Sequence, residues 1–538
     1  MRGTFGTVTA DGSTLTVTGM ELSELRHDVR AALEDPSLTY HQRIQRLANL
    51  AENALEPPPV SQECWDALDK RVICDMYEGN APYRPRYLLP DYARALGNGS
   101  EFLELAPPKD LDEAVTFLLA MYTHVPSITG YPVYIGDMDT LLEPFCDGVS
   151  DAELAHKLRL FWVAIDRILP DAFTHANLGP DDSRVGRTIL ALERQLLQVV
   201  PNLTLRVDPE RTPDDYVLDA VRTVFACGKP HFVNHPMMVA DLGDRYGVVS
   251  CYNSLLVGGG AHTLVRLNLK EVVLRHQGGV ATFLSEALPT YVGLTAELAG
   301  ARIRHLVEDT RFFDHSWLVD EGLIGLDRFS AMFGVFGLAE AVDLLQEREV
   351  ATGTYGHDTA ANELALAITS RVAELVAANP LPYCEGNAGR AFLHAQAGLD
   401  SDVGVTAGTR IPVGTEPPLY EHLLAVAPQH HLFPSGVSDV LHFDDTAVRN
   451  PRAVVDVIRG ALAQGMRDVT FNLDSNDFVR ITGYLVRKSD LAKLAKRPEH
   501  GARHGSTLLG AGSVANSHVI QRRVKRVISH ESSPRAAR

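Results

Sequence analysis

The sequence predicts a large mixed α/β protein, because amphipathic helices alternate with short apolar strands along most of the chain. Apolar residues recur at helical spacing in several long segments, and each such segment is followed by a short apolar run. No short-period repeat is present, which argues against a solenoid or a propeller. We therefore expect an α/β sheet or barrel, in which reactive residues lie at strand ends and in the loops that follow. The clearest alternation places helices over 152–168, 184–199 and 213–226 and strands over 203–207, 231–233 and 248–251. An earlier helix is expected over 111–122, with Asp110 as its cap.

Composition limits the classes of function. Hydrophobic residues make up 45% and charged residues 22% of the 538 residues, which is typical of a globular protein in water. The formal charge of −18 argues against nucleic-acid binding, since an acidic surface repels phosphate backbones. Six scattered cysteines without a C-x-x-C pair indicate a reduced compartment and no zinc ribbon. Without an apolar leader or an apolar stretch of ~20 residues, we expect a cytoplasmic protein that is not inserted in a membrane.

The C-terminal third contains the most regular passage of the chain. A helix is predicted from Pro451, with Asn450 as its cap and Gly465 at its end. A strand over 466–473 and a polar turn come next, and they lead into the segment 478–485. A further helix is expected to start at about residue 489.

The segment Arg480-Ile481-Thr482-Gly483-Tyr484 resembles the glycyl radical motif, Arg-Val-[Ser/Thr/Cys]-Gly-Tyr, with isoleucine in place of valine. Glycine suits a radical centre because, without a Cβ, its α-carbon can become planar and can pack closely against other backbone. The resemblance implies that Gly483 stores an unpaired electron and that Arg480, Thr482 and Tyr484 support the loop. The alternative is a glycine that only forms a turn between two strands.

A second residue would have to carry the radical to a substrate, and Cys251 is the candidate. It ends the apolar run 246–251, and a glycine-rich loop and an Arg-Leu-Asn-Leu strand follow it. This arrangement resembles the cysteine loop of glycyl radical enzymes, which implies that the Cys251 thiyl abstracts hydrogen from a small organic substrate. The alternative is a buried structural cysteine, the usual state of a free thiol.

Other segments indicate one branch of this superfamily, which includes the pyruvate formate-lyases and the anaerobic ribonucleotide reductases. Residues 201–206 and 336–342 are similar to segments of formate-lyase-like members. The chain most resembles the YjjI family of glycyl radical enzymes, through residues 79–87, 128–134 and 408–412. The resemblance implies a ten-stranded α/β barrel of the glycyl radical enzyme type, with surrounding helices and with two loops inserted from opposite sides.

The same resemblance implies a domain division and partners. We expect a barrel body over 1–382 that carries the cysteine loop and a glycine radical domain over 383–500. Composition predicts a flexible basic tail over 501–538, because Gly, Ser, His and Arg dominate there and apolar residues become rare. A short basic helix over 519–528 is expected within that tail. The implied partners are a radical S-adenosylmethionine activating enzyme, which would install the glycyl radical, and a second copy of the chain in a homodimer. The enzyme would act anaerobically and would be oxygen-sensitive.

The residues beside Cys251 differ from those of better-understood relatives. Tyr252 stands where pyruvate formate-lyases carry a second cysteine, and Asn253 stands where radical dehydratases carry a carboxylate base. Another group must then handle protons. Side chains expected to contact the substrate, by residue type and position, are His231, Asn234, His235, Asn253 and Glu385.

No metal site is expected, since the pair His231 and His235 spans a proline-containing segment and has no evident third ligand. Two other functions stay open at this point. One is an anaerobic ribonucleotide reductase-like enzyme, although no cysteine follows Cys384 to form the four-cysteine zinc site usual in that class. The other is a non-catalytic barrel that binds a partner.

Overall fold

The computed structural model describes residues 16–17, 20–76, 78–169, 171–349, 353–395, 404–437, 439–481 and 483–515. Thr482 and the helix expected over 519–528 lie outside these residues. A single hydrophobic cluster runs through the described part from Cys64 to Val486. The division into a barrel body and a glycine radical domain stays a prediction. Among the described residues, no helix is long and apolar enough to cross a membrane.

The first of two five-stranded sheets forms from the middle of the chain. Four of its strands are parallel, and the fifth, β15, runs antiparallel to β8. Every residue of β6 and β7 is buried, as expected for parallel strands covered on both faces. The strand order is β15 (Asp468–Val469), β8 (His231–Asn234), β7 (Asn202–Val207), β6 (His175–Leu178) and β5 (Tyr134–Asp137).

The second sheet has β11 at its centre. Its parallel strands are β11, β12 and β13, and two short strands from the N-terminal part pair antiparallel with β11. Together the sheets contain as many strands as expected. No strand pair of the described residues joins them, so a single closed ring of ten strands is not confirmed. The members are β13 (Phe392–Ala395), β12 (Phe329–Phe336), β11 (Gly259–Asn268), β3 (Ile73–Cys74) and β4 (Tyr87–Leu89).

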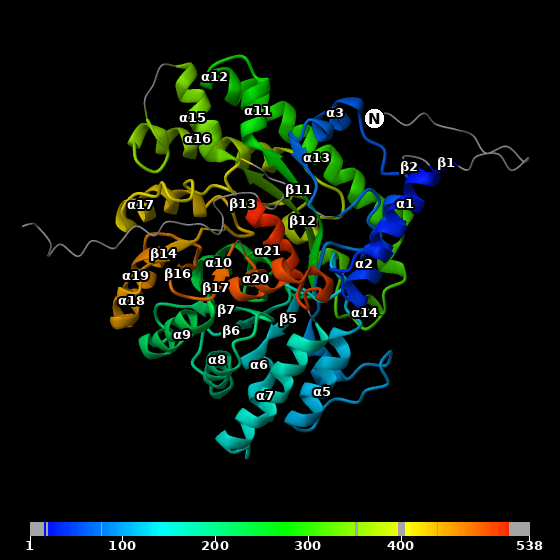
Figure 1. Cartoon of the computed structure of the whole chain (residues 1–538), viewed down its shortest axis with the longest axis vertical. Coiled ribbons are helices and arrows are strands. Elements are labelled where there is room, and N and C mark those ends of the chain that lie inside the picture. Colours follow the sequence, from blue (N-terminus) through cyan, green and yellow to red (C-terminus); the bar gives the residue numbers. More distant parts are fainter. Residues whose placement is uncertain are drawn as a thin grey trace, which may run out of the picture.

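Helices flank both sheets, and in Figure 1 most of those near the first sheet lie below or to the left of its strands, whereas most of those near the second sheet lie above its strands. The lower group follows the first sheet and begins as expected with a helix capped by Asp110, whose carboxylate accepts from Glu113 N at 3.0 Å. Its helices are α5 (Leu111–Tyr122), α6 (Met138–Leu142), α7 (Asp151–Ile168), α8 (Arg184–Leu196), α9 (Asp214–Cys227) and α10 (His235–Leu242).

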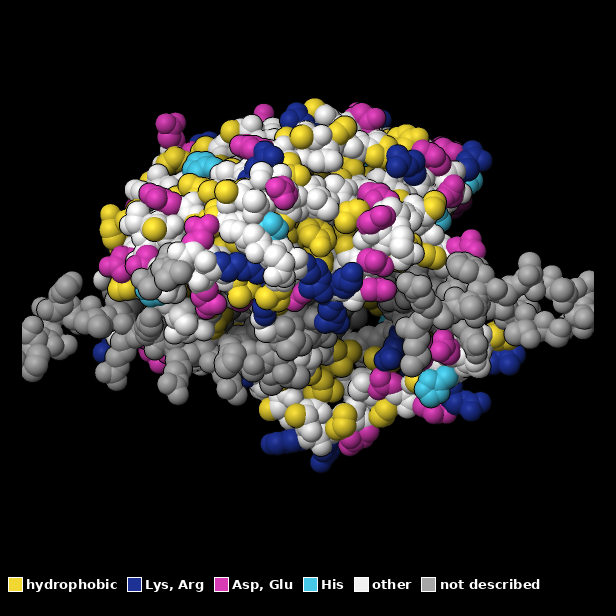
Figure 2. Space-filling model, turned by 90° about the horizontal axis from the view of Figure 1, so that it is seen from above, with side chains coloured by type: hydrophobic (Ala, Val, Ile, Leu, Met, Phe, Trp, Pro, Cys, Tyr) yellow, Lys and Arg dark blue, Asp and Glu magenta, His cyan; other side chains and the backbone are white. Residues whose placement is uncertain are grey.

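The upper group packs on the second sheet, and the N-terminal helices lie beside it. The face of the molecule seen from above carries acidic and basic side chains next to one another (Figure 2). The helices of this half are α11 (Leu269–Arg275), α12 (Val280–Thr282), α13 (Leu288–Arg304), α14 (Trp317–Asp320), α15 (Leu338–Arg348), α16 (Thr359–Ala378) and α17 (Leu419–His430). The N-terminal elements are β1 (Thr16–Val17), β2 (Met20–Glu21), α1 (Leu22–Glu34), α2 (Tyr40–Asn53), α3 (Gln62–Asp69) and α4 (Tyr92–Asn98).

Two hairpins complete the molecule, one from the middle of the chain and one from its C-terminal part. The helix expected from Pro451 is confirmed, and so is the one expected near residue 489. The first hairpin pairs β9 (Tyr246–Val249) with β10 (Asn253–Leu256), and the second pairs β17 (Phe478–Arg480) with β18 (Leu485–Arg487). The other C-terminal elements are β14 (Leu441–Phe443), α18 (Thr446–Arg449), α19 (Pro451–Ala463), β16 (Phe471–Leu473) and α20 (Lys488–Lys496).

The first part of the tail expected from residue 501 is helical and packed against the rest of the molecule. Helix α21 spans Gly505–Ala515 and lies beside α20 (Figure 1). Ala502 and His504 are buried just before it, and a Cβ on Gly510 would lie 2.9 Å from Val486. The small residues that suggested a mobile tail therefore allow close packing of this helix. The rest of the expected tail, 516–538, lies outside the described residues.

Candidate functional site

The hairpin formed by β9 and β10, here called the cysteine hairpin, carries Cys251 at its tip. Val249 pairs with Asn253, so the turn consists of residues 250–252. Ser250 and Tyr252 have φ angles of 52° and 66°, the left-handed region that residues other than glycine rarely adopt. Cys251 itself is 1% exposed. A buried thiol between two strained residues indicates a turn whose shape serves a purpose other than chain reversal.

The hairpin formed by β17 and β18, here called the glycine hairpin, brings Gly483 against that turn. Arg480 pairs with Leu485, which leaves Gly483 in the tip. A Cβ on Gly483 would lie 2.0 Å from the Cα and 2.7 Å from the Cβ of Cys251. Any side chain at position 483 would overlap the backbone of Cys251, so this contact requires glycine. The structure thus brings together the two residues that the sequence analysis singled out.

Two side chains from other elements, Asn202 and Asn472, and the hairpin's own Arg480 hold the glycine hairpin. The amide nitrogen of Asn202, at the start of β7, donates to the carbonyl oxygen of Gly483. The fully buried guanidinium of Arg480 donates to the same oxygen at 3.3 Å and to Gly228 O at 2.8 Å. Asn472 accepts from the backbone N–H of Arg480 at 2.8 Å and donates to its carbonyl at 2.9 Å. Arg480 therefore ties the tip of the glycine hairpin to the segment before β8, and its role in supporting a radical loop stays a prediction.

The other residues expected to support the loop have different outcomes. Tyr484 is buried, and its ring meets that of Phe173 edge-on with centroids 6.0 Å apart. Thr482 lies outside the described residues.

The cysteine hairpin is held by the first sheet through its backbone. Asn177 of β6 donates to Val248 O and accepts from Val248 N, both at 2.8 Å. Arg206 of β7 donates to Tyr246 O at 2.7 Å. One buried amide side chain therefore continues the sheet into the hairpin, in the way that another strand would.

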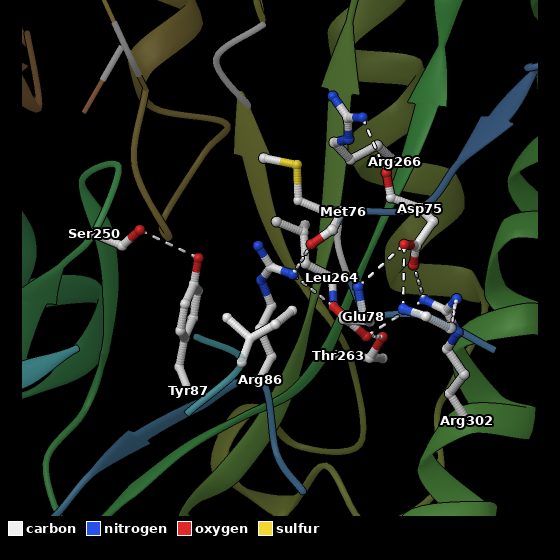
Figure 3. A network of polar contacts seen from close by, with 12 residues as sticks. Asp75, Met76, Glu78, Arg86, Tyr87, Ser250, Thr263, Leu264, Arg266 and Arg302 are labelled. Carbon is white, nitrogen blue, oxygen red and sulfur yellow. Dashed lines mark hydrogen bonds and ion pairs between the residues drawn. The ribbon is translucent and has the colours of Figure 1, made fainter. Parts of the chain in front are cut away.

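The second sheet reaches the cysteine hairpin through Tyr87. Its hydroxyl donates to Ser250 Oγ and accepts from the amide of Asn253, each at 3.4 Å (Figure 3). The guanidinium of Arg86 lies over the Tyr87 ring, 4.9 Å from its centroid. Burial raises the pKa of Tyr87, so the phenol stays protonated.

Arg86 belongs to a buried ionic network drawn in Figure 3. Glu78, which is 4% exposed, accepts from Arg86 at 3.0 Å and from the backbone of Leu264 at 2.7 Å. Arg302 pairs with Asp75 at 2.7 Å and with Glu78 at 3.4 Å. Each charge in the network has an opposite charge beside it, which is the condition for burying it. The network therefore fixes Arg86 and, through it, the ring of Tyr87.

Two neutral histidines lie on the other side of the cysteine hairpin. The ring of His231 packs on Tyr252, with centroids 4.2 Å apart. Thr204 bridges His231 at 3.2 Å and His175 at 2.7 Å. Burial, with the charge of nearby Arg480, lowers the pKa of His175 to about 3 and that of His231 well below its usual value. Both imidazoles are therefore neutral at physiological pH and can offer one donor and one acceptor each.

A buried carboxyl group stands in the same region. Asp468 of β15 is fully buried, and its Oδ2 accepts from Val437 N at 3.2 Å. Its Oδ1 has no hydrogen-bond partner in the described part of the chain. Burial raises its pKa to about 8, although Arg467 and Arg410 oppose the shift. Asp468 is thus a carboxyl group that carries its proton at neutral pH.

Arg410 links this carboxyl group to the two hairpins. It is buried, and it donates to Ile481 O at 3.5 Å in the glycine hairpin. Burial lowers its pKa, while the charges of Asp439, Asp468 and the groups of the cysteine turn act on it in the opposite sense. Asp439 lies within ion-pair distance of His422, with 3.6 Å between Oδ1 and Nε2, and the neighbouring histidines hold its pKa below the usual range despite burial.

The structure separates the five expected substrate-binding residues. His231 and Asn253 lie at the cysteine turn, and Asn253 Oδ1 is buried without a partner among the described residues. Asn234 instead caps α10 and donates to Leu462 O at 3.0 Å, so its side chain has a structural use. The Nδ1 atom of His235 and the hydroxyl of Tyr246 form a hydrogen bond of 2.9 Å. This bond lies at the base of the cysteine hairpin and away from its tip. Glu385 is exposed in a short 3₁₀ helix, Glu385–Asn387.

The expectations for Asn234, His235 and Glu385 are therefore corrected, because none of them reaches the cysteine turn. These side chains were chosen by residue type, and residue type does not show whether a side chain points toward the cysteine turn. Several groups at the site were missed. Tyr87, Asn202 and Arg410 lie in segments that carried the family resemblance, which was a usable signal; Asn177, Asn472 and Asp468 lie in segments with no such signal. Among the described residues, no cluster of three or more histidine, cysteine, aspartate and glutamate side chains could hold a metal ion.

Solved structures with the same fold define the class of protein. The anaerobic ribonucleotide reductase of Thermotoga maritima superposes with a TM-score of 0.63 at 12% identity, over 88% of this chain and 90% of that one. The hydroxyproline dehydratase of Clostridioides difficile gives 0.61 at 11% identity, over 90% and 88%. The B12-independent glycerol dehydratase of Clostridium butyricum gives 0.58 at 13% identity, over 80% of each chain. The expected α/β barrel is thus confirmed as the fold of glycyl radical enzymes.

Sequence comparison then gives the family. The profile of the YjjI-like glycyl radical enzymes matches residues 38–525. The YjjI protein of Escherichia coli (strain K12) is 47% identical over 513 residues, which cover 95% of this chain and 98% of that protein. A protein of Haemophilus influenzae is 40% identical over 505 residues, or 93% and 97%. The chain belongs to the YjjI-like family of glycyl radical enzymes, as the sequence motifs predicted.

Proposed function

We propose that Gly483 stores the radical of this enzyme and that Cys251 carries it to the substrate. One observation supports both assignments: a Cβ on Gly483 would lie 2.0 Å from the Cα of Cys251. A glycine is required there, and the residue that it touches is a buried thiol. A turn glycine without chemistry would not need the backbone of a cysteine as its neighbour.

The proposed cycle moves one hydrogen atom at a time. An activating enzyme, with S-adenosylmethionine and an iron–sulfur cluster, removes a hydrogen atom from the Gly483 α-carbon. The Gly483 radical takes the hydrogen of the Cys251 thiol, which restores the glycine and leaves a thiyl. The thiyl takes a hydrogen atom from a C–H bond of a small organic substrate, and the product radical finally takes that hydrogen back. Burial of both hairpins keeps water away from these intermediates.

We propose further that the substrate is polar and that Asp468 supplies the proton which Asn253 cannot handle. The raised pKa keeps the Asp468 carboxyl protonated at neutral pH. A neutral carboxyl with a free oxygen can donate a proton to a departing hydroxyl group, as a radical elimination needs. Neutral His231 and the amide of Asn253 can orient that group by hydrogen bonds.

We propose the following compartment, assembly and activating partner for the enzyme. The enzyme works in the cytoplasm under anaerobic conditions as a homodimer, and residues 383–500 act as its glycine radical domain. A radical S-adenosylmethionine enzyme is its activating partner, as glycyl radical enzymes in general require. No metal ion bound to this chain takes part.

The experiment is anaerobic electron paramagnetic resonance after incubation with the cognate activating enzyme, S-adenosylmethionine and a reductant. We expect a doublet split by the single remaining α-hydrogen. The signal should be absent in Gly483→Ala and retained in Cys251→Ala, because the cysteine acts after the store. No signal with an activating enzyme that cleaves S-adenosylmethionine would contradict the proposal and would favour a non-catalytic barrel.

A further inference from the structure

A cavity of about 500 Å³ lies in the segment that follows the glycine hairpin. Its walls come from the end of β18, from α20, from a 3₁₀ turn (Pro498–His500) and from α21. This volume suits a small molecule. The lining residues are Arg487, Asp490, Lys493, Leu494, Lys496, Arg497, His500, Gly501, Ala502, Arg503, His504 and Thr507.

The lining is strongly cationic in a protein whose net charge is −18. It contains five lysine and arginine side chains but one carboxylate, Asp490. The cations also act on one another. Burial and the charge of Arg487 lower the pKa of Arg503, and burial with the charges of Arg503 and Arg487 lowers that of Arg167 at the end of α7. These are the conditions under which a bound anion is stabilised.

The carboxylates near the cavity already pair with arginine, lysine or histidine side chains. Asp490 pairs with Arg487 at 2.5 Å and with Lys493 at 3.1 Å. Asp166, beneath the cavity, accepts from Arg503 at 2.5 Å and from His504 at 2.9 Å. Lys496 and Arg497 are exposed at the rim and have no carboxylate within ion-pair distance in the described part of the chain. Positive charge therefore remains without a partner on this side of the cavity.

We propose that this cavity is a second ligand site, for a small compound that carries a phosphate or diphosphate group. Guanidinium groups match the geometry of phosphate oxygens, and lysine adds point charge. The cavity is too small for a nucleic-acid strand, and the acidic remainder of the surface disfavours one. The inference does not depend on radical chemistry, because the cavity lies outside the contact between Gly483 and Cys251.

The position of the cavity gives the ligand a structural effect. Its walls follow directly on β18, the second strand of the glycine hairpin, and Arg503 and His504 bind Asp166 of α7. A bound phosphate would draw α20 and α21 together next to α7. The ligand would thereby stabilise the seated position of the glycine hairpin and would oppose its opening.

The test is isothermal titration of the full-length, unactivated protein with pyrophosphate and, separately, with inorganic phosphate, at constant ionic strength. We expect one site per chain that prefers pyrophosphate. The double variant Lys496→Gln/Arg497→Gln should bind at least about tenfold more weakly, because it removes two cationic groups that can make charge-assisted hydrogen bonds to phosphate oxygens. The matched control Lys109→Gln/Arg222→Gln, at exposed positions away from the cavity, should bind like wild type.

A second measurement on the same samples is hydrogen exchange. Pyrophosphate should slow the exchange of amides 485–515 in wild type and in the control, but not in the rim variant. Equal binding by the rim variant and the control, or no binding by wild type, would overturn the inference. Binding of an acidic hexapeptide without binding of pyrophosphate would overturn it too, and would indicate a docking surface for a protein. Because no activation step is involved, failure here is separate from failure of the proposed radical function.

Discussion

The cysteine hairpin and the glycine hairpin meet tip to tip, but their contacts with the rest of the molecule differ. The cysteine hairpin is bound along its strand by the amide of Asn177 and the guanidinium of Arg206, so it extends the first sheet. The glycine hairpin shares part of this pattern, because Asn472 binds the N–H and the carbonyl of Arg480, and each hairpin makes its strand pairs only with itself in the described part of the chain. At the tip of the glycine hairpin, side chains bind the carbonyls of Gly483 and Ile481, and the contact with Cys251 requires the absence of a Cβ.

Hydrogen bonds anchor both hairpins, but the glycine hairpin carries the position at which any side chain would clash. Hydrogen bonds along a strand resist displacement over the whole length of the cysteine hairpin. The glycine hairpin also depends on the close fit of Gly483 against Cys251, so a small side chain at that position should displace its tip without disturbing the sheets. A radical store that an outside enzyme must reach fits the second kind of attachment, and a residue that must meet the substrate fits the first.

The largest effect is expected at Asn177. Asn177→Leu leaves the N–H and C=O of Val248 buried without partners, and each such group costs roughly 1–3 kcal/mol. We expect amides 246–256 to open more easily by about 4 kcal/mol, measured by native-state hydrogen exchange. Asn379→Leu serves as the control, since Asn379 makes one bond to Leu375 O at the end of α16. Unchanged protection in Asn177→Leu would show that the sheet does not hold the cysteine hairpin.

A smaller but more local effect is expected at Gly483. Gly483→Ala should displace the glycine hairpin, with a loss of about 2–3 kcal/mol, because overpacking against backbone atoms cannot be relieved by a side-chain rotation. Hydrogen exchange should show faster exchange in 478–487 and little change in 246–256. Gly460→Ala is the matched control, because a Cβ on Gly460 in α19 meets nothing within 4 Å. Equal loss of protection in both hairpins would mean that they are held as one unit.

The third effect is the smallest for each step of the measurement, because it accumulates gradually with pH, and it concerns the buried carboxyl group of Asp468. Its folded-state pKa is raised to about 8, so its contribution to stability is complete below the usual carboxyl range and is lost as pH rises through 8. Between those limits wild type should lose roughly 1.4 kcal/mol per pH unit relative to Asp468→Asn, which cannot titrate. Denaturant unfolding of both proteins from pH 5 to pH 9 measures the difference. Parallel stability curves would show that Asp468 is already ionised at neutral pH.

Gly483 and Cys251, the two residues proposed to react, could be singled out from the sequence, because each lies in a short motif whose chemistry restricts the residue type. The alternation of helices and strands likewise predicted the barrel, and Pro451 and Asp110 marked helix starts correctly. The residues around Gly483 and Cys251 were harder to predict. Asn177 binds the backbone of Val248, which lies 71 positions away, and local sequence holds no trace of such a partner. Asn472 binds the backbone of Arg480, 8 positions away, but its own segment carries no motif that marks this role.

Burial explains the remaining errors. His231 and His235 stand on the same segment, yet one packs on Tyr252 at the tip of the cysteine hairpin and the other reaches Tyr246 at its base. Asp468 looked like an ordinary strand residue, and only its complete burial gives it an unusual pKa. The glycine- and serine-rich composition after residue 500 suggested mobility, but small residues also permit the close contact of α21 with Val486.

The carbonyl of Gly483 receives two N–H donors, from Asn202 and Arg480. An unpaired electron on the adjacent α-carbon would share its spin density with that oxygen, and donors at the oxygen would draw more of the density away from the carbon. The magnetic coupling to the remaining α-hydrogen would therefore differ between a seated hairpin and one whose carbonyl faces water. The enzyme would carry its own spectroscopic reporter, and the width of the doublet would tell whether the stored electron is in place beside the thiol.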